Sequence, residues 1–122
     1  MANEFGDLLR ALRVAVHVSL GELSRFLEVS VTYLSDVERG TRPPLTVERI
    51  EKAALLLELS PQRTLQLLEV AARTRGVFEL TASNLSPTGS QVGATLMRGW
   101  PRYSEEELQK LAIFLEGLEE ET

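Results

Sequence analysis

The sequence lacks cysteine altogether and contains a single histidine, His17. Without cysteine the chain cannot form a disulfide, use a thiol nucleophile or hold zinc through thiolates. One histidine without partners does not predict a metal site, so we interpret His17 as a turn residue. The polar residues also form no Ser/His/Asp set and no glycine-rich phosphate loop. We therefore expect no enzyme activity, no catalytic residues, no metal and no cofactor.

Long apolar runs are absent as well. No stretch approaches the roughly 18 apolar residues that a membrane-spanning helix needs, and the first residues do not resemble a signal peptide. A hydrophobic content of 43% over 122 residues nevertheless predicts a folded chain, either one domain or one small domain with an accessory element. We expect a soluble cytoplasmic protein that does not contact a membrane.

Basic residues are outnumbered by acidic ones, and the formal net charge of −5 at first sight opposes nucleic-acid binding. The charge is unevenly distributed, however. Residues 1–76 carry ten acidic and ten basic side chains, whereas residues 77–122 carry eight acidic and three basic ones. The first part can therefore still present a basic side. With so few cations, we expect modest non-specific DNA affinity and a shallow dependence on salt.

The most informative stretch is residues 20–40, LGELSRFLEVSVTYLSDVERG. Its first half has apolar residues at helical spacing, and Ser19 with Glu22 can form a capping box at the start. The pattern breaks before Ser30, which can cap a second helix that Gly40 ends. Two short helices joined by a turn of a few residues indicate a helix-turn-helix.

The second of these helices divides its side chains between two faces. At 100° per residue, Leu34, Val37 and Glu38 fall on one side. A short polar arc lies opposite and contains Thr32, Ser35, Asp36 and Arg39. Such a helix can bury one face and offer the other to a DNA groove. An ordinary amphipathic surface helix has the same pattern. The arrangement of side chains around the helix is therefore compatible with a DNA-reading helix and with a plain surface helix.

The segment SLGELSRFLEVSVTYLSDVERGTRPPLTVERIEKAALLL closely resembles the helix-turn-helix of the phage-repressor/Cro-like (XRE) family of bacterial regulators. The resemblance covers about residues 5–72 and is densest in YLSDVERG. The matching residues are Glu22-Leu23-Ser24, Val29-Ser30, Tyr33-Leu34-Ser35, Val37-Glu38-Arg39-Gly40 and Pro44. It implies an all-α fold with a five-helix lambda-repressor-like DNA-binding domain. It also implies that Arg13 of the first helix pairs with Glu38 in a structural ion pair.

The resemblance further implies how the protein would meet double-stranded DNA. The helix over 30–39 would enter the major groove. The side chains expected to meet base edges are Val31, Thr32, Ser35, Asp36 and Arg39. The positions expected to face phosphates are Ser19, Leu20, Tyr33, Thr41, Arg42 and Arg10. For Arg10, a solvated charge is an equally good interpretation.

Three residues depart from the family pattern. Leu20 stands where the family usually has glutamine, and leucine cannot hydrogen-bond to a phosphate. Glu28 and His17 stand at positions of glycine, so Glu28 has to take up a turn conformation that glycine enters more easily. Asp36 is also unusual at a base-facing position. It could accept from a cytosine amino group or pair with Arg39 three residues later.

Helix signals continue on both sides of this motif. We expect a first helix over 4–16, a fourth after Thr46 and a fifth from Pro61 to Gly76. Together these five helices predict a DNA-binding domain over 1–76. Residues 77–93 are rich in Ser, Thr, Gly and Asn without a clear period, which predicts a linker.

Residues 94–122 are expected to form a C-terminal helical element. A short helix around Gln91–Arg98 would end before Pro101, and the last helix would begin with a capping box of Ser104 and Glu107. Its apolar surface is too large for a lone solvated helix, so it should pack on its own domain, a second copy or another protein. The residues expected to form this contact are Trp100, Leu108, Leu111, Ala112, Phe114, Leu115 and Leu118.

The leading hypothesis is a sequence-specific DNA-binding transcriptional regulator that acts as a dimeric repressor. One such module reads too few base pairs for useful specificity, and a symmetric dimer on a palindromic operator solves this. The alternative is an antitoxin-type autoregulator whose acidic C-terminal segment docks a toxin or other protein partner. Cleavage by a protease within 81–93, as in some members of the family, is a third hypothesis.

Overall fold

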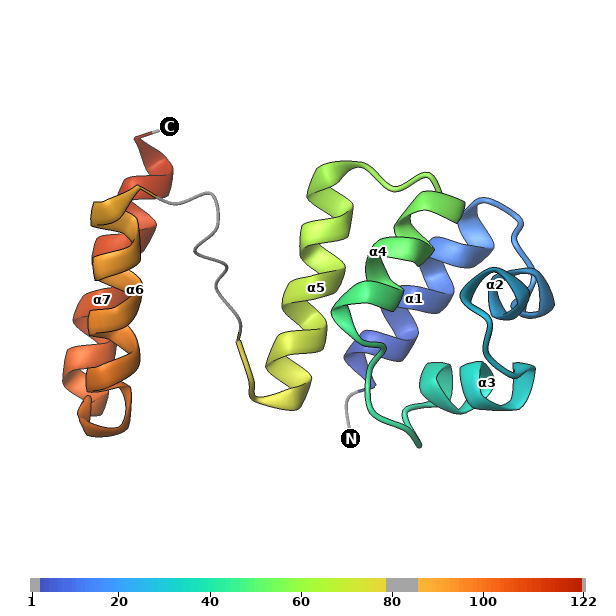
Figure 1. The fold of residues 1–122 in the computed structure, drawn as a ribbon, viewed down its shortest axis with the longest axis horizontal. Helices are drawn as coiled ribbons and strands as arrows, with labels where there is room; N and C mark the ends of the chain where they lie inside the picture. Colours follow the sequence, from blue (N-terminus) through green and yellow to red (C-terminus); the bar gives the residue numbers. More distant parts are fainter. Residues whose placement is uncertain (1–2, 79–85, 122) are drawn as a thin grey trace. The chain divides into compact units, whose positions relative to one another are not determined.

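The computed structural model describes residues 3–78 and 86–121, and every regular element in those ranges is helical (Figure 1). The all-α fold is therefore confirmed. The elements are α1 (Glu4–Ala15), α2 (Leu20–Leu27), α3 (Val31–Arg39), α4 (Val47–Leu56), α5 (Pro61–Arg75), α6 (Pro87–Gly99), a 3-10 turn η1 (Trp100–Arg102) and α7 (Glu105–Glu120). The chain divides into two compact units, Met1–Glu79 and Leu80–Thr122.

The predicted caps begin the helices of the first unit. Ser19 accepts from the backbone N–H of Glu22, and the Glu22 carboxylate accepts from the N–H of Ser19, which completes the capping box. Ser30, Thr46 and Ser60 each accept from the N–H three residues later. These hydrogen bonds satisfy backbone donors that have no partner inside the helix, and they fix where α2 to α5 begin.

One apolar core joins the five helices of the first unit. Helix α1 packs on α3 and α5, α2 packs on α3 and α4, and α4 packs on α5. The buried apolar residues are Phe5, Leu9, Leu23, Leu27, Leu34, Val37, Leu45, Ile50, Ala53, Leu57, Leu67, Val70 and Ala71. Because α1 and α2 both press on α3 from the core side, the opposite face of α3 is left exposed to solvent.

The turn between α2 and α3 contains a left-handed residue. Glu28 ends α2 with φ 58° and ψ 42°. This is the left-handed conformation expected at a position where the family usually has glycine. His17, at the second departure, also has φ 58°. A side chain in this region clashes with its own backbone, at a cost of about 1–2 kcal/mol. The turn is therefore formed against a local conformational preference.

We expect Glu28→Gly to raise the free energy of unfolding by about 0.5–1 kcal/mol. Relief of the left-handed strain outweighs the greater backbone entropy that glycine gives to the unfolded chain. Urea denaturation of both proteins measures the difference. Glu51→Gly is the matched control, because Glu51 is exposed inside α4 and the same change there should cost about 1 kcal/mol. A loss of stability at both positions would contradict the strain argument.

The second unit consists of α6, η1 and α7, and the chain reverses its direction at η1. Ser104 and Glu107 form the predicted capping box at the start of α7. Helix α6 begins at Pro87 rather than near Gln91, so the expected linker over 77–93 is wrong in its last part. The reason is local: Ser86 accepts from the N–H of Gly89 and is followed by proline at the first helical position.

None of the residues of α6, η1 or α7 is buried. In the first unit, by contrast, every helix contributes buried residues to the core. The ring of Trp100 meets that of Tyr103 edge-on at 6.3 Å between centroids, at the turn between α6 and α7. Within the described part of the chain, we find no helix with the length and apolar character that crossing a membrane requires.

Candidate nucleic-acid interface

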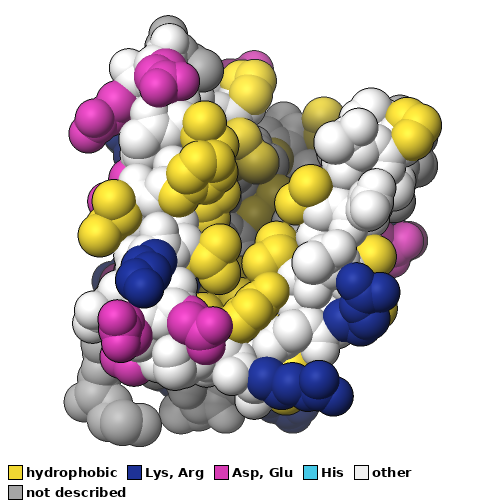
Figure 2. All heavy atoms as spheres, turned by 90° about the vertical axis from the view of Figure 1, so that its left-hand side faces the viewer, with side chains coloured by type: hydrophobic (Ala, Val, Ile, Leu, Met, Phe, Trp, Pro, Cys, Tyr) yellow, Lys and Arg dark blue, Asp and Glu magenta, His cyan; other side chains and the backbone are white. Residues whose placement is uncertain are grey.

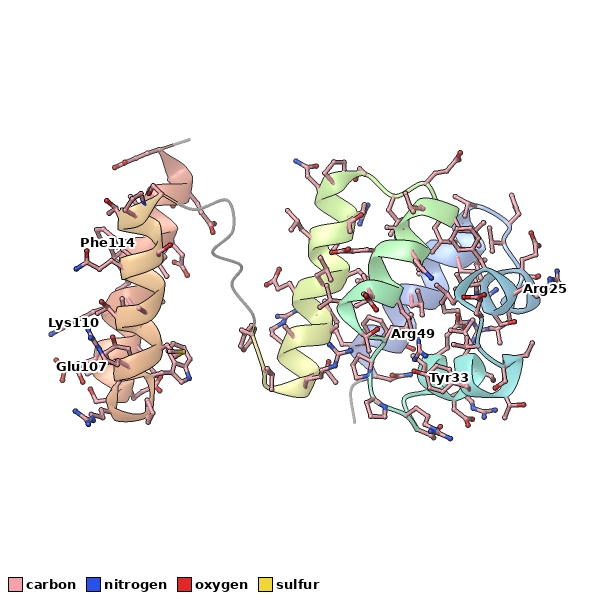
Figure 3. All side chains as sticks on the ribbon, viewed as in Figure 1. Arg25, Tyr33, Arg49, Glu107, Lys110 and Phe114 are labelled. Atoms are coloured by element: carbon pink, nitrogen blue, oxygen red, sulfur yellow. The ribbon has the colours of Figure 1, made fainter. Side chains whose placement is uncertain are left out.

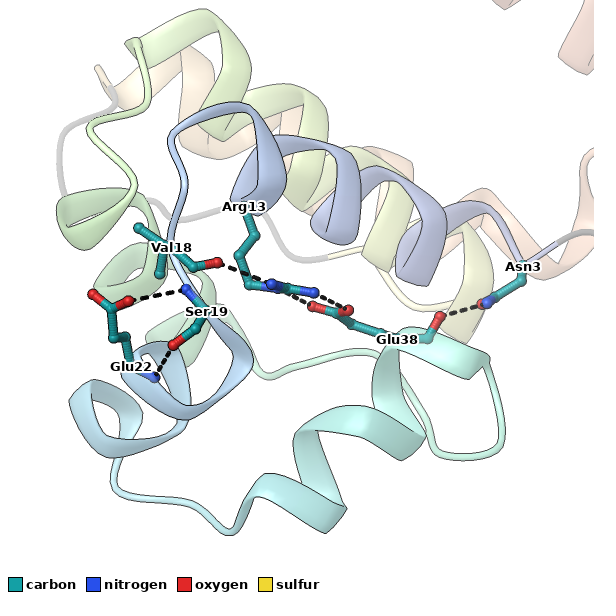
Figure 4. Close-up of polar contacts among 6 residues, drawn as sticks. All are labelled: Asn3, Arg13, Val18, Ser19, Glu22 and Glu38. Atoms are coloured by element: carbon teal, nitrogen blue, oxygen red, sulfur yellow. Dashed lines mark hydrogen bonds and ion pairs between the residues drawn. The ribbon is translucent and has the colours of Figure 1, made fainter.

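A buried ion pair joins α1 to the end of α3. The Nε of Arg13 donates to Oε2 of Glu38 at 2.8 Å, and its Nη2 donates to Oε1 at 2.9 Å (Figure 4). The remaining Nη1 of Arg13 donates to the carbonyl of Val18 at 2.9 Å. Only 11% of the arginine side chain and 5% of the carboxylate side chain are exposed. The structure thus brings together the two residues that the resemblance expected to pair.

The fork-like geometry of this pair has electrostatic consequences. The hydrogen bonds that Arg13 donates to Glu38 raise the pKa of Arg13 above its ordinary value, against the lowering effect of burial, and the negative charge of Glu38 raises it further. A bidentate pair of this kind fixes the rotation of both side chains as well as their separation. Helix α3 is therefore held in one orientation relative to α1, which determines the face of α3 that points outward.

A close backbone approach supports the same end of α3. The Nδ2 of Asn3 donates to the carbonyl of Glu38 at 2.6 Å. A Cβ placed on Gly6 would lie only 2.2 Å from that carbonyl oxygen, so glycine is required there. Gly40 then ends α3 in the left-handed conformation with φ 82°. Two contacts with the Glu38 carbonyl and the left-handed conformation of Gly40 therefore fix the point where α3 gives way to the following loop.

The expected base-contacting residues share the outward side of α3. Val31, Thr32 and Arg39 are exposed, whereas Ser35 and Asp36 are half-buried. Of the two interpretations for Asp36, the free protein contains the pair with Arg39, in which Nη2 of Arg39 donates to Oδ1 of Asp36. The Arg39 side chain is 64% exposed even so, and its remaining donors are accessible. The outward face therefore combines hydroxyls, a methyl-bearing surface and one arginine.

The loop after α3 is held by the end of α5. The Nη2 of Arg75 donates to the carbonyls of Pro44 and Leu45, and Arg73 pairs with Glu4 at 2.7 Å. The hydroxyl of Thr41 donates to the carbonyl of Asp36 at 3.2 Å. The bonds of Arg75 and Thr41 position the loop residues relative to α3 without using the side chain of Arg42, and the Arg73–Glu4 pair joins the end of α5 to α1.

The positions expected to face phosphates fall into separate groups. Ser19 and Thr41 are exposed at a helix start and in the loop, and Arg10 is exposed on α1. Leu20 is half-buried and packs against the core. The remaining two positions, Tyr33 and Arg42, come together, and they are joined by a residue that the sequence did not indicate.

That residue is Arg49, in the first turn of α4. Its guanidinium carbon lies 5.4 Å from the centroid of the Tyr33 ring, and that of Arg42 lies 5.7 Å from the same centroid. The Nη1 of Arg49 donates to the Tyr33 hydroxyl at 3.1 Å, and the two side chains meet between α3 and α4 (Figure 3). We call Tyr33, Arg42 and Arg49 the Tyr33 cluster. Sixteen residues and a helix boundary separate Tyr33 from Arg49, so no local pattern could connect them.

The residues expected to contact a second copy or a partner lie on the second unit. Trp100, Phe114, Leu115 and Leu118 are between 45% and 64% exposed. Ala112 is also exposed, whereas Leu108 and Leu111 are half-buried. Figure 2 shows apolar side chains gathered between α6 and α7. An isolated soluble chain rarely leaves a continuous apolar surface of this kind in water.

Comparison with known proteins gives a consistent result. Residues 4–67 match the family model described as "Helix-turn-helix domain". The chain is also 31% identical over 91 residues to the Transcriptional regulator ClgR of Mycobacterium tuberculosis, in strains CDC 1551 / Oshkosh and ATCC 25618 / H37Rv. The alignment covers 75% of this chain and 77% of that relative. No solved structure matches the chain significantly. The matched region contains α1 to α4 and the first half of α5.

Proposed function

Because the chain belongs to the helix-turn-helix domain family, we propose that it is a DNA-binding transcriptional regulator of the XRE type that acts as a dimeric repressor. The observation that carries this proposal is the outward face of α3. That face is polar and exposed, and the buried pair of Arg13 and Glu38 fixes its direction. Repression then requires only that a bound dimer occlude a promoter.

The outward face of α3 has the chemistry for reading base edges in the major groove. An arginine can donate two hydrogen bonds to guanine, hydroxyls can donate or accept, and a valine can contact the methyl group of thymine. The base-reading set is Val31, Thr32, Ser35, Asp36 and Arg39. In the free protein Asp36 neutralises Arg39, so DNA binding has to exchange that pair for contacts with a base. Only a base that offers good acceptors to Arg39 repays this exchange, which contributes to specificity.

The phosphate side of the proposal comprises Ser19, Thr41, Arg42, Tyr33 and Arg10. Their exposed or half-buried donors lie at the start of α2, on α3, in the loop after α3 and on α1. Such contacts set the orientation and affinity of a protein on DNA but carry no sequence information. Leu20 belongs to this side by position only, because it offers no donor.

The direct test is a mobility-shift assay at several salt concentrations with random duplexes and palindromic duplexes selected from a random pool. We expect binding that weakens as salt rises and that is tighter for the selected sites. The full-length protein should be used, since the second unit is part of the proposal. Absence of salt-sensitive binding to any duplex would overturn the function.

Two arginines separate specificity from affinity. We expect Arg39→Ala to lose about 1–3 kcal/mol of discrimination between the selected site and a variant with one changed base pair, because a base contact is lost. Arg42→Ala should weaken binding to all duplexes alike and reduce the salt dependence. Competition titrations with matched and mismatched duplexes measure both. Equal effects of the two substitutions on specificity would contradict the assignment of Arg39 to bases.

Dimerisation is proposed on the second unit. Its helices bury no side chain, although they carry Trp100, Phe114, Leu115 and Leu118 on their surface. A second copy would cover the apolar surface that the second unit leaves exposed. It would also bring two recognition helices to the two halves of a palindromic site.

A protein partner is the second candidate for the same apolar surface. The second unit holds the acidic residues that give the chain its net charge, including Glu116, Glu120 and Glu121. An acidic apolar segment complements a basic partner, which suits the antitoxin-type autoregulator. Co-expression with the small basic protein encoded beside it, if there is one, followed by co-purification would test this. Failure to co-purify such a protein would remove the candidate.

A further inference from the structure

The Tyr33 cluster brings two positive charges to one aromatic ring with no carboxylate between them. In the described residues, the side chains that pair with acidic groups are Arg13, Arg39, Arg73 and Lys110. Neither Arg42 nor Arg49 is among them. Both guanidinium carbons lie within 5.7 Å of the same ring centroid, and like charges held around one ring repel each other in the free protein. A bound anion would change that repulsion into attraction.

The cluster also has unused hydrogen-bond donors. One N–H of Arg49 donates to the Tyr33 hydroxyl, and the guanidinium of Arg42 has no hydrogen-bond partner within the described ranges. A guanidinium has five N–H donors in a rigid fork, so most of them remain available. Because the Tyr33 oxygen accepts from Arg49 and its O–H has no acceptor within the described ranges, that O–H is free to donate to a ligand. All three side chains therefore offer donors and none offers a charged acceptor.

The place of Arg49 on its helix points in the same direction. Arg49 is the third residue of α4, and its backbone N–H donates to the Thr46 side chain that caps the helix. The start of a helix carries partial positive charge and favours acidic side chains over basic ones. Arg63 holds the same third position in α5, so a cation there does not by itself indicate a ligand. At α4, however, the charge of Arg49 adds to the positive end of the helix and to the charge of Arg42 beside the same ring.

We propose that the Tyr33 cluster is a preformed clamp for a single phosphate of the DNA backbone, in which Arg49 is a further DNA-binding residue. The proposal rests on the proposed function, and it adds a contact from α4 to those expected from α3 and its loop. Guanidinium groups match the planar pairs of phosphate oxygens, and charge-assisted hydrogen bonds to them are the strong ones.

The ring of Tyr33 explains why the clamp is preformed. Tyr33 is half-buried and packs against the apolar core, so the ring has a fixed position before DNA arrives. Both arginines rest on that ring through cation–π contacts and lose less side-chain freedom on binding than freely solvated arginines do. Since the clamp contacts only the backbone, it should add affinity for every duplex without adding sequence preference.

The first test compares salt dependence among single variants of the full chain. We expect Arg49→Gln to weaken binding about tenfold on selected and random duplexes alike, and to lower the slope of log affinity against log salt by about 1. Tyr33→Phe keeps the ring and both cation contacts but removes the hydroxyl. It should weaken binding by about threefold with the salt slope unchanged, because no charge is lost.

Arg63→Gln is the matched control, since it removes the same charge from the same unit. Arg63 is exposed in the first turn of α5 and donates to Gln66. Helix α5 begins at the end of the first unit away from α3 (Figure 1). Circular dichroism shows whether each variant is folded at the assay temperature. If Arg49→Gln unfolds, Arg49→Lys replaces it and should keep the salt slope while losing part of the affinity, because the charge stays but the fork is lost.

The second test separates a direct contact from a purely structural role of Arg49. A selected duplex is made neutral at one phosphate at a time by methylphosphonate substitution. We expect one position per half-site at which the wild type loses affinity and the Arg49→Gln protein loses almost none, since the partner of that phosphate is already gone. If every sensitive position stays sensitive in Arg49→Gln, Arg49 only orients Tyr33 and the clamp is wrong.

The outcomes distinguish the clamp from the underlying function. Wild-type protein that binds no duplex in a salt-sensitive manner overturns the proposed function and the clamp together. Wild-type protein that binds normally, with Arg49→Gln indistinguishable from Arg63→Gln, overturns the clamp alone. A reduced salt slope together with the loss of one methylphosphonate-sensitive position supports the clamp.

Discussion

Replacing Glu38 with alanine is expected to lower the free energy of unfolding of the first unit by about 3–5 kcal/mol, because it leaves a buried arginine without its carboxylate. The Arg13 side chain is only 11% exposed, and it donates two hydrogen bonds to Glu38 and one to the carbonyl of Val18. Since small domains are stable by only about 5–15 kcal/mol, the variant should be partly unfolded at 37 °C or unfold well below the wild-type temperature.

Urea denaturation followed by circular dichroism measures this loss. Glu4→Ala is the matched control, because Glu4 pairs with Arg73 on the surface, where about half of each side chain is exposed. That substitution should lower the free energy of unfolding by less than about 1 kcal/mol. The double variant Arg13→Met with Glu38→Leu should recover most of the loss, since it removes both charges together. A double variant as unstable as Glu38→Ala would mean that the loss comes from packing rather than from an unpaired charge.

The same pair illustrates what the sequence could and could not predict. The spacing of residues alone predicts that the charged Glu38 lies on the inward side of α3. Its partner, however, lies 25 residues earlier in α1, and only the family resemblance indicated Arg13. The helix starts were accessible without any resemblance, because a cap is a local hydrogen bond between residues three apart. Ser19, Ser30 and Thr46 all begin helices as predicted.

The errors have physical causes of two kinds. The start of α6 was missed although Ser86 and Pro87 repeat the signal that correctly located α5, because the glycines and serines that follow favoured a linker. Arg49 was missed for a different reason. Its contact with Tyr33 depends on how α3 and α4 approach each other, and no periodicity encodes that distance. Local signals thus give the elements, whereas the composition of the Tyr33 cluster is a property of packing.

The outward face of α3 lies between these two cases. Spacing places Thr32, Ser35, Asp36 and Arg39 on one side of a helix, but the sequence left open whether Asp36 would pair with Arg39. The structure contains the pair in the free protein. The contacts with bases stay a prediction, since they depend on a groove that only DNA supplies.

The second large effect is expected at the apolar surface of the second unit. Leu115→Glu should convert a dimer into a monomer at micromolar concentrations, because it places a charge in a surface that the dimer would desolvate. Leu115 is 52% exposed and lies in α7, which has no buried residue. The affinity for a palindromic site should then fall by roughly 10²–10⁴. In a dimer, binding of one subunit holds the other close to the second half-site, and a monomer loses this advantage.

Light scattering gives the mass in solution, and titration of palindromic and single half-site duplexes gives the affinities. Leu55→Glu is the matched control, since Leu55 is 73% exposed on α4 of the first unit and should leave both mass and affinity unchanged. The variant Leu115→Glu should bind a single half-site as the wild type does, because its first unit is intact. If a fragment of residues 1–76 remains dimeric, the first unit forms the dimer interface and the second unit is free for a partner. If the full chain is monomeric, the proposed dimer is wrong. Each half of a palindromic site should then bind the protein with the same affinity as an isolated half-site.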